Sequence, residues 1–353
     1  MFNTEPKNIE IDLHFTNRCN LKCKHCIYSS GERNILEIPV KKIKTFLKEA
    51  VEIGANRIHI AGGEPFVREK SDLYGVVEEA AKLNLKPRVL TNGLTINKKN
   101  IKELKERGLY SLLVSIDGLE KYHNNMRGLS SSFSKAIEAL MIAKNSKLIT
   151  IVNTVVTKEN IKEIVDVLDI TTKIPVDTQS FVYLTPQSRA VQLKHLMPSL
   201  SDWKNVKEKI YKYYQLKKSL HTRTRIQKGY IGEGERAYCR IKDKNNCLIM
   251  SDGEVFPCVL FTASPSYSLG NINKTSIKDI WFNSEKWKKY EEIFNKRRYS
   301  CDNCKNCDGG CIGFSNLLAK NIFECDPRCE KDNNLIPYCI REYETVESSQ
   351  NME

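Results

Sequence analysis

The stretch RCNLKCKHC, residues 18–26, decides how the rest of the sequence is interpreted. Cys19, Cys23 and Cys26 lie within eight residues, and the next cysteine along the chain is Cys239. A structural zinc site normally has four protein ligands, and an iron–sulfur cubane normally has four cysteines. Adjacent residues of a tight loop do not face the same metal, so we expect His25 to point away. The spacing predicts a metal centre with three thiolates and one open coordination position, with zinc as the alternative metal.

The composition is typical of a globular protein made in a reducing compartment. The chain has 353 residues, of which 41% are hydrophobic and 28% are charged. Its first residues contain no basic segment followed by an apolar one, so we predict no signal peptide. No apolar run reaches membrane-spanning length, so we expect a cytoplasmic protein without a membrane partner. Thirteen cysteines in such a compartment favour metal binding over disulfide bonds.

The net charge of +13 has two interpretations. Lysines are spread along the whole chain, which favours a lysine-rich solvated surface. The alternative is attraction to an acidic partner, such as an acidic peptide or a polycarboxylate. The sequence has no zinc-finger or RNA-recognition motif, so we predict no nucleic-acid partner.

The first half of the chain alternates short apolar runs with amphipathic segments. This alternation predicts a parallel sheet with helices packed outside it, and six strand–helix units suit a partial or open α/β barrel. The expected strands are residues 9–15, 57–61, 87–91, 112–116, 148–156 and 178–183. The expected helices are residues 40–53, 72–83, 98–107, 132–145 and 160–171.

Distinctive turns follow the first four expected strands. The cysteine loop follows the first strand, and GGEP (62–65), TNG (91–93) and SIDG (115–118) follow the next three. In α/β barrels the chemistry takes place at the carboxyl ends of the strands. We therefore expect these four turns to meet at one mouth of the barrel.

The composition changes along the chain and predicts four parts. Residues 1–190 form the barrel, and residues 191–235 form a helical bridging segment with one basic helix near 202–220. Residues 236–335 form a cysteine-rich domain with short elements. Residues 336–353 form a polar tail, which we expect to be disordered.

The spacing Cys-x3-Cys-x2-Cys, with a ring-bearing residue before the third cysteine, resembles the radical S-adenosylmethionine (radical SAM) superfamily. The resemblance implies a partial (β/α)6 TIM-like barrel and a 4Fe-4S cluster held by Cys19, Cys23 and Cys26. S-adenosylmethionine would bind the open iron through its amino and carboxylate groups. Its reductive cleavage would release a 5′-deoxyadenosyl radical that abstracts a hydrogen atom from the substrate, with the chemistry supplied by the cofactor.

The same resemblance assigns cofactor-binding residues to the turns of the barrel. AGGEPF looks like the family's Gly-Gly-Glu motif: the glycines would let backbone approach the ligand, and the glutamate would accept a hydrogen bond from its ammonium group. The serine of SIDG would help to hold the methionyl carboxylate. The residues assigned in this way are Gly62, Gly63, Glu64, Pro65, Ser115, Arg127, Asn153 and Leu184.

Several of these assignments have alternatives. A Gly-Gly pair by itself is an ordinary tight turn. Asp117 of SIDG is either part of the site or a cap of the following turn. Arg127 either pairs with the methionyl carboxylate or is a surface arginine. Asn153 and Leu184 are assigned as adenosine neighbours from their position alone.

The cysteines of the C-terminal part resemble the SPASM extension of radical SAM enzymes, although the gap between Cys304 and Cys307 is two residues instead of the family's five. This resemblance implies a first auxiliary cluster on Cys239, Cys258 and Cys311, and a second on Cys301, Cys304, Cys307 and Cys329. Cys247 is either a fourth ligand of the first cluster or a small buried hydrophobe. Cys325 competes with Cys329 for the last ligand position. Zinc sites are the alternative for the whole set.

SPASM-type enzymes mostly modify peptides or oxidise small molecules. In the sulfatase-maturing group an aspartate follows the second SPASM cysteine and serves as a base, but here Val259 follows Cys258. The first expected strand starts near residue 9, so we expect no N-terminal leader-binding module. A separate leader-peptide-binding protein could replace it. A flavodoxin or ferredoxin would supply the electron.

Three functions are therefore compared. The first is radical modification of a ribosomally made peptide, such as a crosslink or thioether. The second is a small-molecule dehydrogenase or epimerase in natural-product or cofactor biosynthesis, with Cys247, Cys325 or Cys339 as hydrogen donor. The third is a non-catalytic iron–sulfur electron carrier, which would have no use for an open iron. The sequence identifies no catalytic base.

Overall fold

The computed structural model describes residues 9–31, 36–217, 222–226, 239, 241–297, 310–324, 326–327 and 344–346. Six of the cysteines discussed above lie outside these residues, namely Cys301, Cys304, Cys307, Cys325, Cys329 and Cys339. In the described part of the chain, every helix is too short or too polar to cross a bilayer.

One sheet of 11 strands runs through the molecule in the order β10-β9-β8-β1-β2-β3-β4-β5-β6-β7-β11. The strands from β8 to β7 in this order are parallel to their neighbours, and β9, β10 and β11 are antiparallel. The sheet is open within the described residues, with β10 and β11 at its edges. Its strands are β1 (Ile9–Thr16), β2 (Ala55–Gly62), β3 (Lys86–Thr91), β4 (Ser111–Ser115), β5 (Ile149–Val156), β6 (Thr178–Tyr183), β7 (Arg223–Ile226), β8 (Asn246–Ile249), β9 (Glu254–Phe256), β10 (Gly270–Asn271) and β11 (Glu344–Val346).

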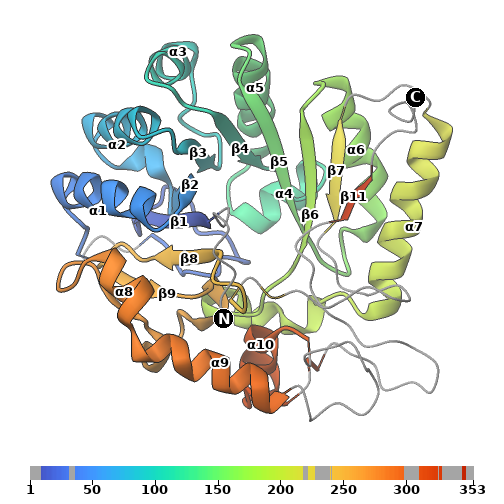
Figure 1. Cartoon of the computed structure of the whole chain (residues 1–353). Helices are drawn as coiled ribbons and strands as arrows, with labels where there is room; N and C mark the ends of the chain where they lie inside the picture. Colours follow the sequence, from blue (N-terminus) through green and yellow to red (C-terminus); the bar gives the residue numbers. More distant parts are fainter. Residues whose placement is uncertain are drawn as a thin grey trace, which may run out of the picture.

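The helices of the barrel follow the outer side of the curved sheet (Figure 1). They are α1 (Val40–Glu52), α2 (Lys70–Lys82), α3 (Lys98–Glu106), α5 (Ser132–Asn145), α6 (Ile164–Lys173) and α7 (Leu200–Leu216). Helix α4 (Glu120–Arg127) instead lies at the centre of the view, and its Met126 carbonyl accepts a hydrogen bond from the Lys24 amide of the cysteine loop at 2.8 Å. This contact places α4 at the mouth of the barrel.

The alternation of β1 explains how the barrel core forms. Ile9, Ile11, Leu13 and Phe15 are at most 2% exposed and belong to the core that also contains the apolar face of α1. Each such side chain contributes about 1.5–3 kcal/mol on burial. Successive residues of a strand point to opposite faces, so the intervening Glu10, Asp12 and His14 face the inside of the barrel.

The predicted α/β fold is confirmed. Each of the six expected strands ends within two residues of its predicted limits. The helix expected at 160–171 is divided into a 3-10 turn η2 (Ile161–Glu163) and α6. Helix α4 was not predicted, because its sequence EKYHNNMR shows no continuous apolar face.

The C-terminal part shares the sheet and the core of the barrel. Strand β8 pairs in parallel with β1, with Cys247 opposite Ile11. The part also contains α8 (Ile277–Asn283), α9 (Glu285–Arg297), α10 (Ile312–Phe314) and the short turns η4 (Val259–Phe261), η5 (Pro265–Tyr267) and η6 (Ser315–Ala319). Its Ile277 amide donates to Glu49 of α1 at 2.9 Å. Hydrogen bonds of the sheet therefore join the two parts on either side of the predicted boundary near residue 236.

The bridging segment is more than the single helix that we expected. It contains η3 (Ser188–Leu196) and α7, which ends at Leu216, followed by β7 at the edge of the parallel strands. Within the polar tail, Glu344–Val346 form β11, which pairs with β7 in the antiparallel direction. Apolar content alone did not reveal this pairing, because both strands are short and polar.

Helix α7 packs on the barrel through aromatic stacking. Trp203 is fully buried and lies on Tyr183 of β6, with ring centroids 3.8 Å apart and ring planes 22° apart. Val206 and Ile210, one and two turns further along, are also fully buried in the same core. The helix is therefore an integral part of the barrel wall.

Replacing Trp203 with alanine should lower the free energy of unfolding by about 3–5 kcal/mol, because it leaves a large cavity between α7 and β6. Denaturant-induced unfolding followed by circular dichroism measures this. Tyr211→Ala, at a position of the same helix that is 39% exposed, is the matched control and should change stability far less. Equal effects of the two substitutions would contradict the packing described here.

Candidate functional site

The cysteine loop follows β1 and is held by its own backbone. Cys19, Cys23 and Cys26 are each partly buried. The Gly31 amide donates to the Asn17 carbonyl at 3.0 Å, which closes the loop. Burial is the main cause that raises the pKa of the Cys19 thiol to about 12, and the charges of Glu64, Cys23 and Cys26 act in the same direction. The Cys23 and Cys26 thiols are therefore close enough to Cys19 to affect its ionisation.

Two glycines let the turn after β2 pack directly on this loop. The Gly63 amide donates to the Thr16 carbonyl at 2.6 Å, and the Glu64 amide donates to the Arg18 carbonyl at 2.9 Å. A Cβ atom on Gly62 would lie 2.4 Å from the Thr16 oxygen, and one on Gly63 would lie 2.1 Å from the Arg18 oxygen. Real Cβ atoms do not approach oxygen so closely. The glycines therefore let this turn approach the backbone of the cysteine loop. That they also let backbone approach the ligand stays a prediction.

Glu64 is completely buried and ties this turn to the next one. Its carboxylate accepts hydrogen bonds from Thr91 Oγ1 at 2.8 Å, from the Asn92 amide at 2.7 Å and from the Phe66 amide at 3.3 Å. Burial raises its pKa to about 7, although these donors oppose the shift. A carboxylate has about four acceptor positions, so one remains for the ammonium contact that the sequence predicts.

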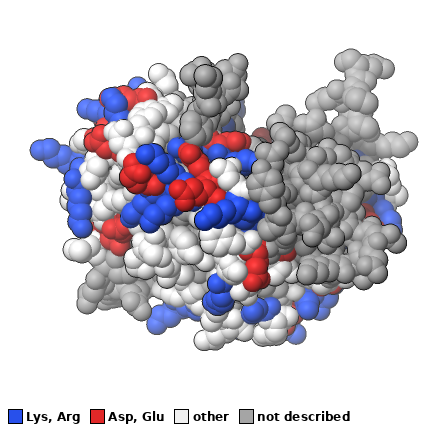
Figure 2. Space-filling view, turned by 60° about the horizontal axis from the view of Figure 1, so that its bottom comes forward, with Lys and Arg blue, Asp and Glu red and all other residues white. Residues whose placement is uncertain are grey.

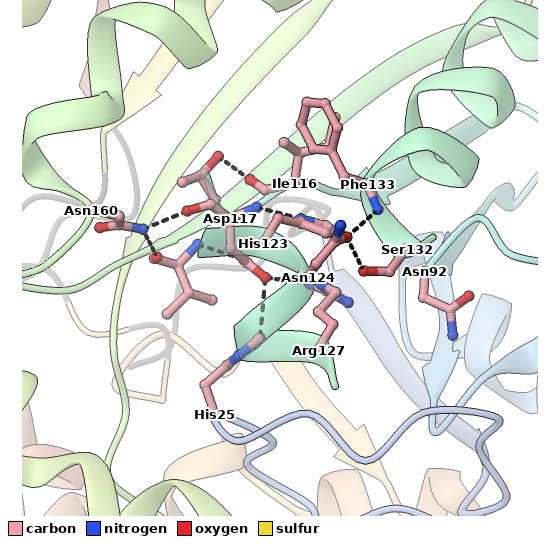
Figure 3. A network of polar contacts seen from close by, with 12 residues as sticks. His25, Asn92, Ile116, Asp117, His123, Asn124, Arg127, Ser132, Phe133 and Asn160 are labelled. Carbon is pink, nitrogen blue, oxygen red and sulfur yellow. Dashed lines mark hydrogen bonds and ion pairs between the residues drawn. The ribbon is translucent and has the colours of Figure 1, made fainter. Parts of the chain in front are cut away.

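Arg127 is buried and belongs to a network of polar contacts around α4 (Figure 3). Its Nε and Nη2 atoms lie 2.9 and 2.8 Å from Asp117 Oδ2. His25 Nε2 lies 3.5 Å from the same oxygen, so the imidazole is turned toward Asp117. Arg127 is thus not a surface arginine, and Asp117 does more than cap a turn.

The Arg127 charge also acts on the cysteine loop. It lowers the pKa of the Cys23 thiol, opposing the larger effect of burial, and the Cys19 thiolate acts on Arg127 in return. Thiolates rather than thiols bind iron, so a buried cation beside two of them favours metal binding. Despite its burial, Asp117 has a pKa well below its usual range, because Arg127 lies against it.

Asp117 further connects α4 to the ends of β4 and β5. Its amide donates to His123 Nδ1 at 3.1 Å, and its Oδ1 accepts from the Val155 amide at 3.2 Å. Asn160 Nδ2 donates to the Asp117 carbonyl at 2.5 Å and to the Val155 carbonyl at 2.8 Å (Figure 3). Burial and the Arg127 charge lower the pKa of His123 to about 3, so its ring is neutral. Sequence reasoning missed His123 and Asn160.

The predicted serine and asparagine lie side by side on the inner face of the sheet. Ser115 is in register with Asn153 on β5, and Asn153 is in register with Ser180 on β6. These three polar residues form one row across the sheet, from the carboxyl end of β4 to the middle of β5 and β6. Leu184 is completely buried just after β6, and its amide donates to the Val156 carbonyl at 3.2 Å.

Charged residues nearer the amino ends of β1 and β2 form a second group that sequence reasoning missed. Asp12 Oδ1 lies 2.8 Å from His59 Nδ1, and Glu10 Oε1 lies 2.7 Å from Arg57 Nη1. His14 is 1% exposed, and its ring lies 4.3 Å from that of Tyr28. The signal was present in IEIDLHFT, because charges alternating with apolar residues in an inner strand face a polar interior.

The described cysteines of the C-terminal part fall into two groups. The charges of Cys311 and Cys258 both act on the Cys239 thiol, whose pKa is raised mainly by burial. Cys258 and Cys311 also contact a small core with Leu260 and Phe314. The structure thus brings together the three ligands predicted for the first auxiliary cluster. The four predicted ligands of the second cluster, Cys301, Cys304, Cys307 and Cys329, lie outside the described residues.

Cys247 belongs to neither site. It is fully buried in β8 among the hydrophobic residues of the barrel core, and the charge that acts on it is that of Asp12. Its register partner Ile11 faces the helices, so the thiol lies on the helix-covered side of the sheet. This placement matches the small buried hydrophobe rather than the ligand or hydrogen donor.

Two family models match the chain. One, described as the radical SAM superfamily, covers residues 13–170, and the other, an iron–sulfur cluster-binding domain named SPASM, covers residues 239–308. The chain belongs to the radical SAM superfamily. It is a radical SAM enzyme with a C-terminal SPASM domain.

Similar proteins extend over nearly the whole radical SAM enzyme. An AdoMet-dependent heme synthase of Methanosarcina barkeri is 24% identical over 88% of this chain and 93% of its own length. A PqqA peptide cyclase of Bradyrhizobium diazoefficiens is 23% identical over 90% of this chain and 84% of its own length. Streptococcus suis SuiB bound to S-adenosylmethionine has the same fold, with a TM-score of 0.77 at 20% identity over 92% of this chain and 78% of that chain.

The residues at the mouth of the radical SAM barrel fit the group that the family implies. Three mutually interacting thiols lie beside the buried Arg127 cation, which suits a cluster of iron bound by thiolates. Among the described residues, no three Cys, His, Asp or Glu side chains converge on one ion. A cubane needs only one thiolate on each iron, so its ligands surround the cluster instead of meeting at a point.

Removing the Glu64 charge should flatten the pH dependence of stability. The folded-state pKa of about 7 lies above the ordinary value of 4.5, so the folded protein keeps a proton that the unfolded chain has lost. Stability should fall by about 3 kcal/mol as the pH rises from 4.5 to 7. Glu64→Gln should lose this slope, whereas the exposed Glu120→Gln should keep it. Unfolding measured across this pH range tests the expectation, and identical slopes in the two variants would contradict it.

Cys247→Ala should leave the iron content unchanged, because the thiol lies in the barrel core. The loss of the buried sulfur should cost about 1 kcal/mol of stability. Cys258→Ala is the matched control and should lower the iron content, since it removes a predicted cluster ligand. Iron per chain after anaerobic reconstitution decides between them. A fall in iron with Cys247→Ala would restore this cysteine as a ligand.

Proposed function

We propose that this radical SAM enzyme modifies a ribosomally made peptide, by hydrogen-atom abstraction followed by formation of a crosslink, thioether or related bond. The observation that carries the proposal is the polar interior of the barrel. The pairs Asp12–His59 and Glu10–Arg57 line its inner face with both charges and with hydrogen-bonding groups. Such a lining suits a polar chain with amide and charged groups. It is a poor match for an extended apolar molecule.

Each residue of the site has a proposed role. Cys19, Cys23 and Cys26 hold the cluster, and Arg127 keeps their charge in balance. Ser115, Asn153 and Glu64 orient S-adenosylmethionine by hydrogen bonds to its polar groups, and Leu184 closes the apolar side. With the cofactor bound, the cluster supplies a 5′-deoxyadenosyl radical that takes a hydrogen atom from the substrate. Burial of this mouth keeps water from the reactive species.

The remaining components of the proposal concern electrons and partners. Cys239, Cys258 and Cys311 would hold one auxiliary cluster, and Cys301, Cys304, Cys307 and Cys329 a second. These clusters would bind the substrate or accept an electron from it, and a flavodoxin or ferredoxin would supply the electron for the radical SAM cluster. A separate protein presents the leader of the peptide. Streptococcus suis SuiB, which shares the fold, has also been solved with the precursor peptide SuiA, and the PqqA peptide cyclases are among the relatives. Both support a peptide substrate.

Surface charge contributes little to the choice of partner. Figure 2 shows Lys and Arg intermixed with Asp and Glu over the described part of the face that it presents. Surface ion pairs such as Lys278–Glu52 and Lys288–Glu285 bring opposite charges together. This mixture favours the interpretation of the net charge as a solvated lysine-rich surface. The proposed peptide is therefore recognised in the barrel and not by a broad basic patch.

The second function is a small-molecule reaction in cofactor biosynthesis, which the heme synthase relatives favour. An epimerase of this kind would need a thiol to return the hydrogen atom. Cys247 does not face the barrel interior, so it does not support that role. The heme synthase and the peptide cyclase named above are enzymes, which favours the first two functions over an electron carrier.

Anaerobic reconstitution followed by reaction with S-adenosylmethionine and a reductant tests the proposal. We expect about twelve irons per chain, from three cubanes, and release of 5′-deoxyadenosine. Short peptides encoded beside the gene are then added, and mass spectrometry should show a loss of hydrogen from one of them. The variant Cys23→Ala should release no 5′-deoxyadenosine.

Two outcomes would contradict the proposal. Peptides that stay unchanged while a small molecule of the same gene neighbourhood is converted would establish the second function. Full iron content without 5′-deoxyadenosine would remove the radical chemistry itself.

A further inference from the structure

One short segment after β6 contacts both cysteine sites. It consists of Gln187, Ser188 and Arg189, where the bridging segment leaves the barrel. These residues lie between the regions matched by the two family models, and sequence analysis assigned them no role. We call them the 187–189 link. Its two ends bind loops that are more than 200 residues apart in the sequence.

Gln187 binds the loop that carries Cys258. Its side chain is 2% exposed, and its Nε2 atom donates to the Val259 carbonyl at 3.2 Å and to Thr262 Oγ1 at 2.6 Å. The Phe261 amide of this loop donates to the Cys258 carbonyl at 3.1 Å. The buried amide group of Gln187 is therefore bound one residue away from a predicted ligand of the first auxiliary cluster.

Arg189 binds the loop that carries the radical SAM cysteines. Its Nη1 atom donates to the Cys23 carbonyl at 3.1 Å, and its Nη2 atom donates to the Ser30 carbonyl at 2.8 Å. The two acceptors lie on either side of Cys26 in the sequence, so one guanidinium spans the second half of the cysteine loop. Its planar fork makes this two-point contact specific, which a lysine could not reproduce.

The residue between them turns the chain. Ser188 is an exposed non-glycine residue with φ of 52°, in the left-handed region that L-amino acids rarely adopt. Backbone held in this conformation is maintained by the structure around it. Here the hydrogen bonds of both neighbouring side chains provide that support.

We propose that Gln187 and Arg189 are positioning residues that hold the first auxiliary cluster of the SPASM domain at a set distance and orientation from the radical SAM cluster. The inference rests on the proposed function, because it needs a cluster on Cys239, Cys258 and Cys311. Hydrogen bonds close to cluster ligands set their orientation and the potential of the cluster. The link thus also contributes to the potential of the auxiliary cluster.

The link has a consequence for the substrate. The substrate of a radical SAM enzyme must reach the radical, and the proposed auxiliary cluster must lie within reach of the same substrate. The ring of Tyr28 lies 4.3 Å from that of His14, and the charges of Cys26 and Cys258 both act on Tyr28. Tyr28 is therefore near both of the sites whose spacing the link maintains.

The test compares Gln187→Leu with Gln192→Leu, which replaces an exposed glutamine of η3, just beyond the link. Both are reconstituted with iron and sulfide in the full chain and reduced in the presence of S-adenosylmethionine. A redox titration followed by electron paramagnetic resonance gives the reduction potential of each cluster. The spectra of the reduced protein give the magnetic interaction between the clusters. We expect Gln187→Leu to shift the auxiliary potential and to change the interaction, while the radical SAM cluster still binds S-adenosylmethionine. Gln192→Leu should match the wild type.

The second arm compares Arg189→Met with Lys194→Met, which removes an exposed cation from the same segment. Arg189→Met should change the interaction between clusters and lower the rate of S-adenosylmethionine cleavage about 10-fold. Lys194→Met should leave both unchanged. Because both residues act on one spacing, the effects of Gln187→Leu and Arg189→Met on the interaction should not add in the double variant.

The outcomes separate the link from the proposed function. A wild-type enzyme with an auxiliary signal, and a Gln187→Leu variant with the same potential and interaction, would overturn the link alone. A wild-type enzyme without any auxiliary signal would overturn the cluster assignment on which it rests. If Gln187→Leu does not fold, Thr262→Val removes one acceptor of the same contact and should shift the auxiliary potential in its place. An unchanged potential there would overturn the link.

Discussion

The backbone contact between the cysteine loop and the turn after β2 is the constraint on which the site depends. Gly63 and Glu64 donate their amides to the carbonyls of Thr16 and Arg18, and no Cβ atom fits between the two segments. The backbones of the turn and of the cysteine loop are therefore in direct contact, with no side chain between them. Glu64 then reaches from this turn to Thr91 and Asn92, so the carboxyl ends of three strands are joined in sequence. Each strand end supplies one part of the site.

The buried charges near the cysteine loop occur as an ion pair. Asp117 neutralises Arg127, and Arg127 in turn offsets the thiolates that a cluster requires. A buried ion pair is expensive to desolvate and contributes little net stability, so its presence indicates a role other than folding. Here that role is to keep a cation beside Cys19 and Cys23. The remaining groups around Asp117, including His25 and His123, are held by the same carboxylate or its amide.

The SPASM region is attached to the barrel by the sheet itself. Strand β8 pairs alongside β1, and the cysteine loop starts at the carboxyl end of β1. Two cluster-bearing regions that are distant in sequence thus share one strand as their support. A hydrogen-bonded sheet resists relative movement better than a flexible linker does. The 187–189 link adds a second attachment, through the hydrogen bonds of Gln187 and Arg189.

The sequence by itself determined the elements of the barrel and the identity of its chemistry. Periodicity of apolar residues defined the six strands, because each pattern is local. The spacing of three cysteines predicted a metal centre with three thiolates, because the ligands lie within one loop, and the resemblance of this motif to the radical SAM superfamily identified its chemistry. Only the tertiary structure decided what depends on residues far apart in the chain. The two glycines allow close packing against the cysteine loop. Arg127, on a helix without a continuous apolar face, pairs with Asp117. Cys247 is buried in the core beside Ile11. Gln187 and Arg189 acquired their partners in the same way, since no local pattern marks a hydrogen bond between such distant loops.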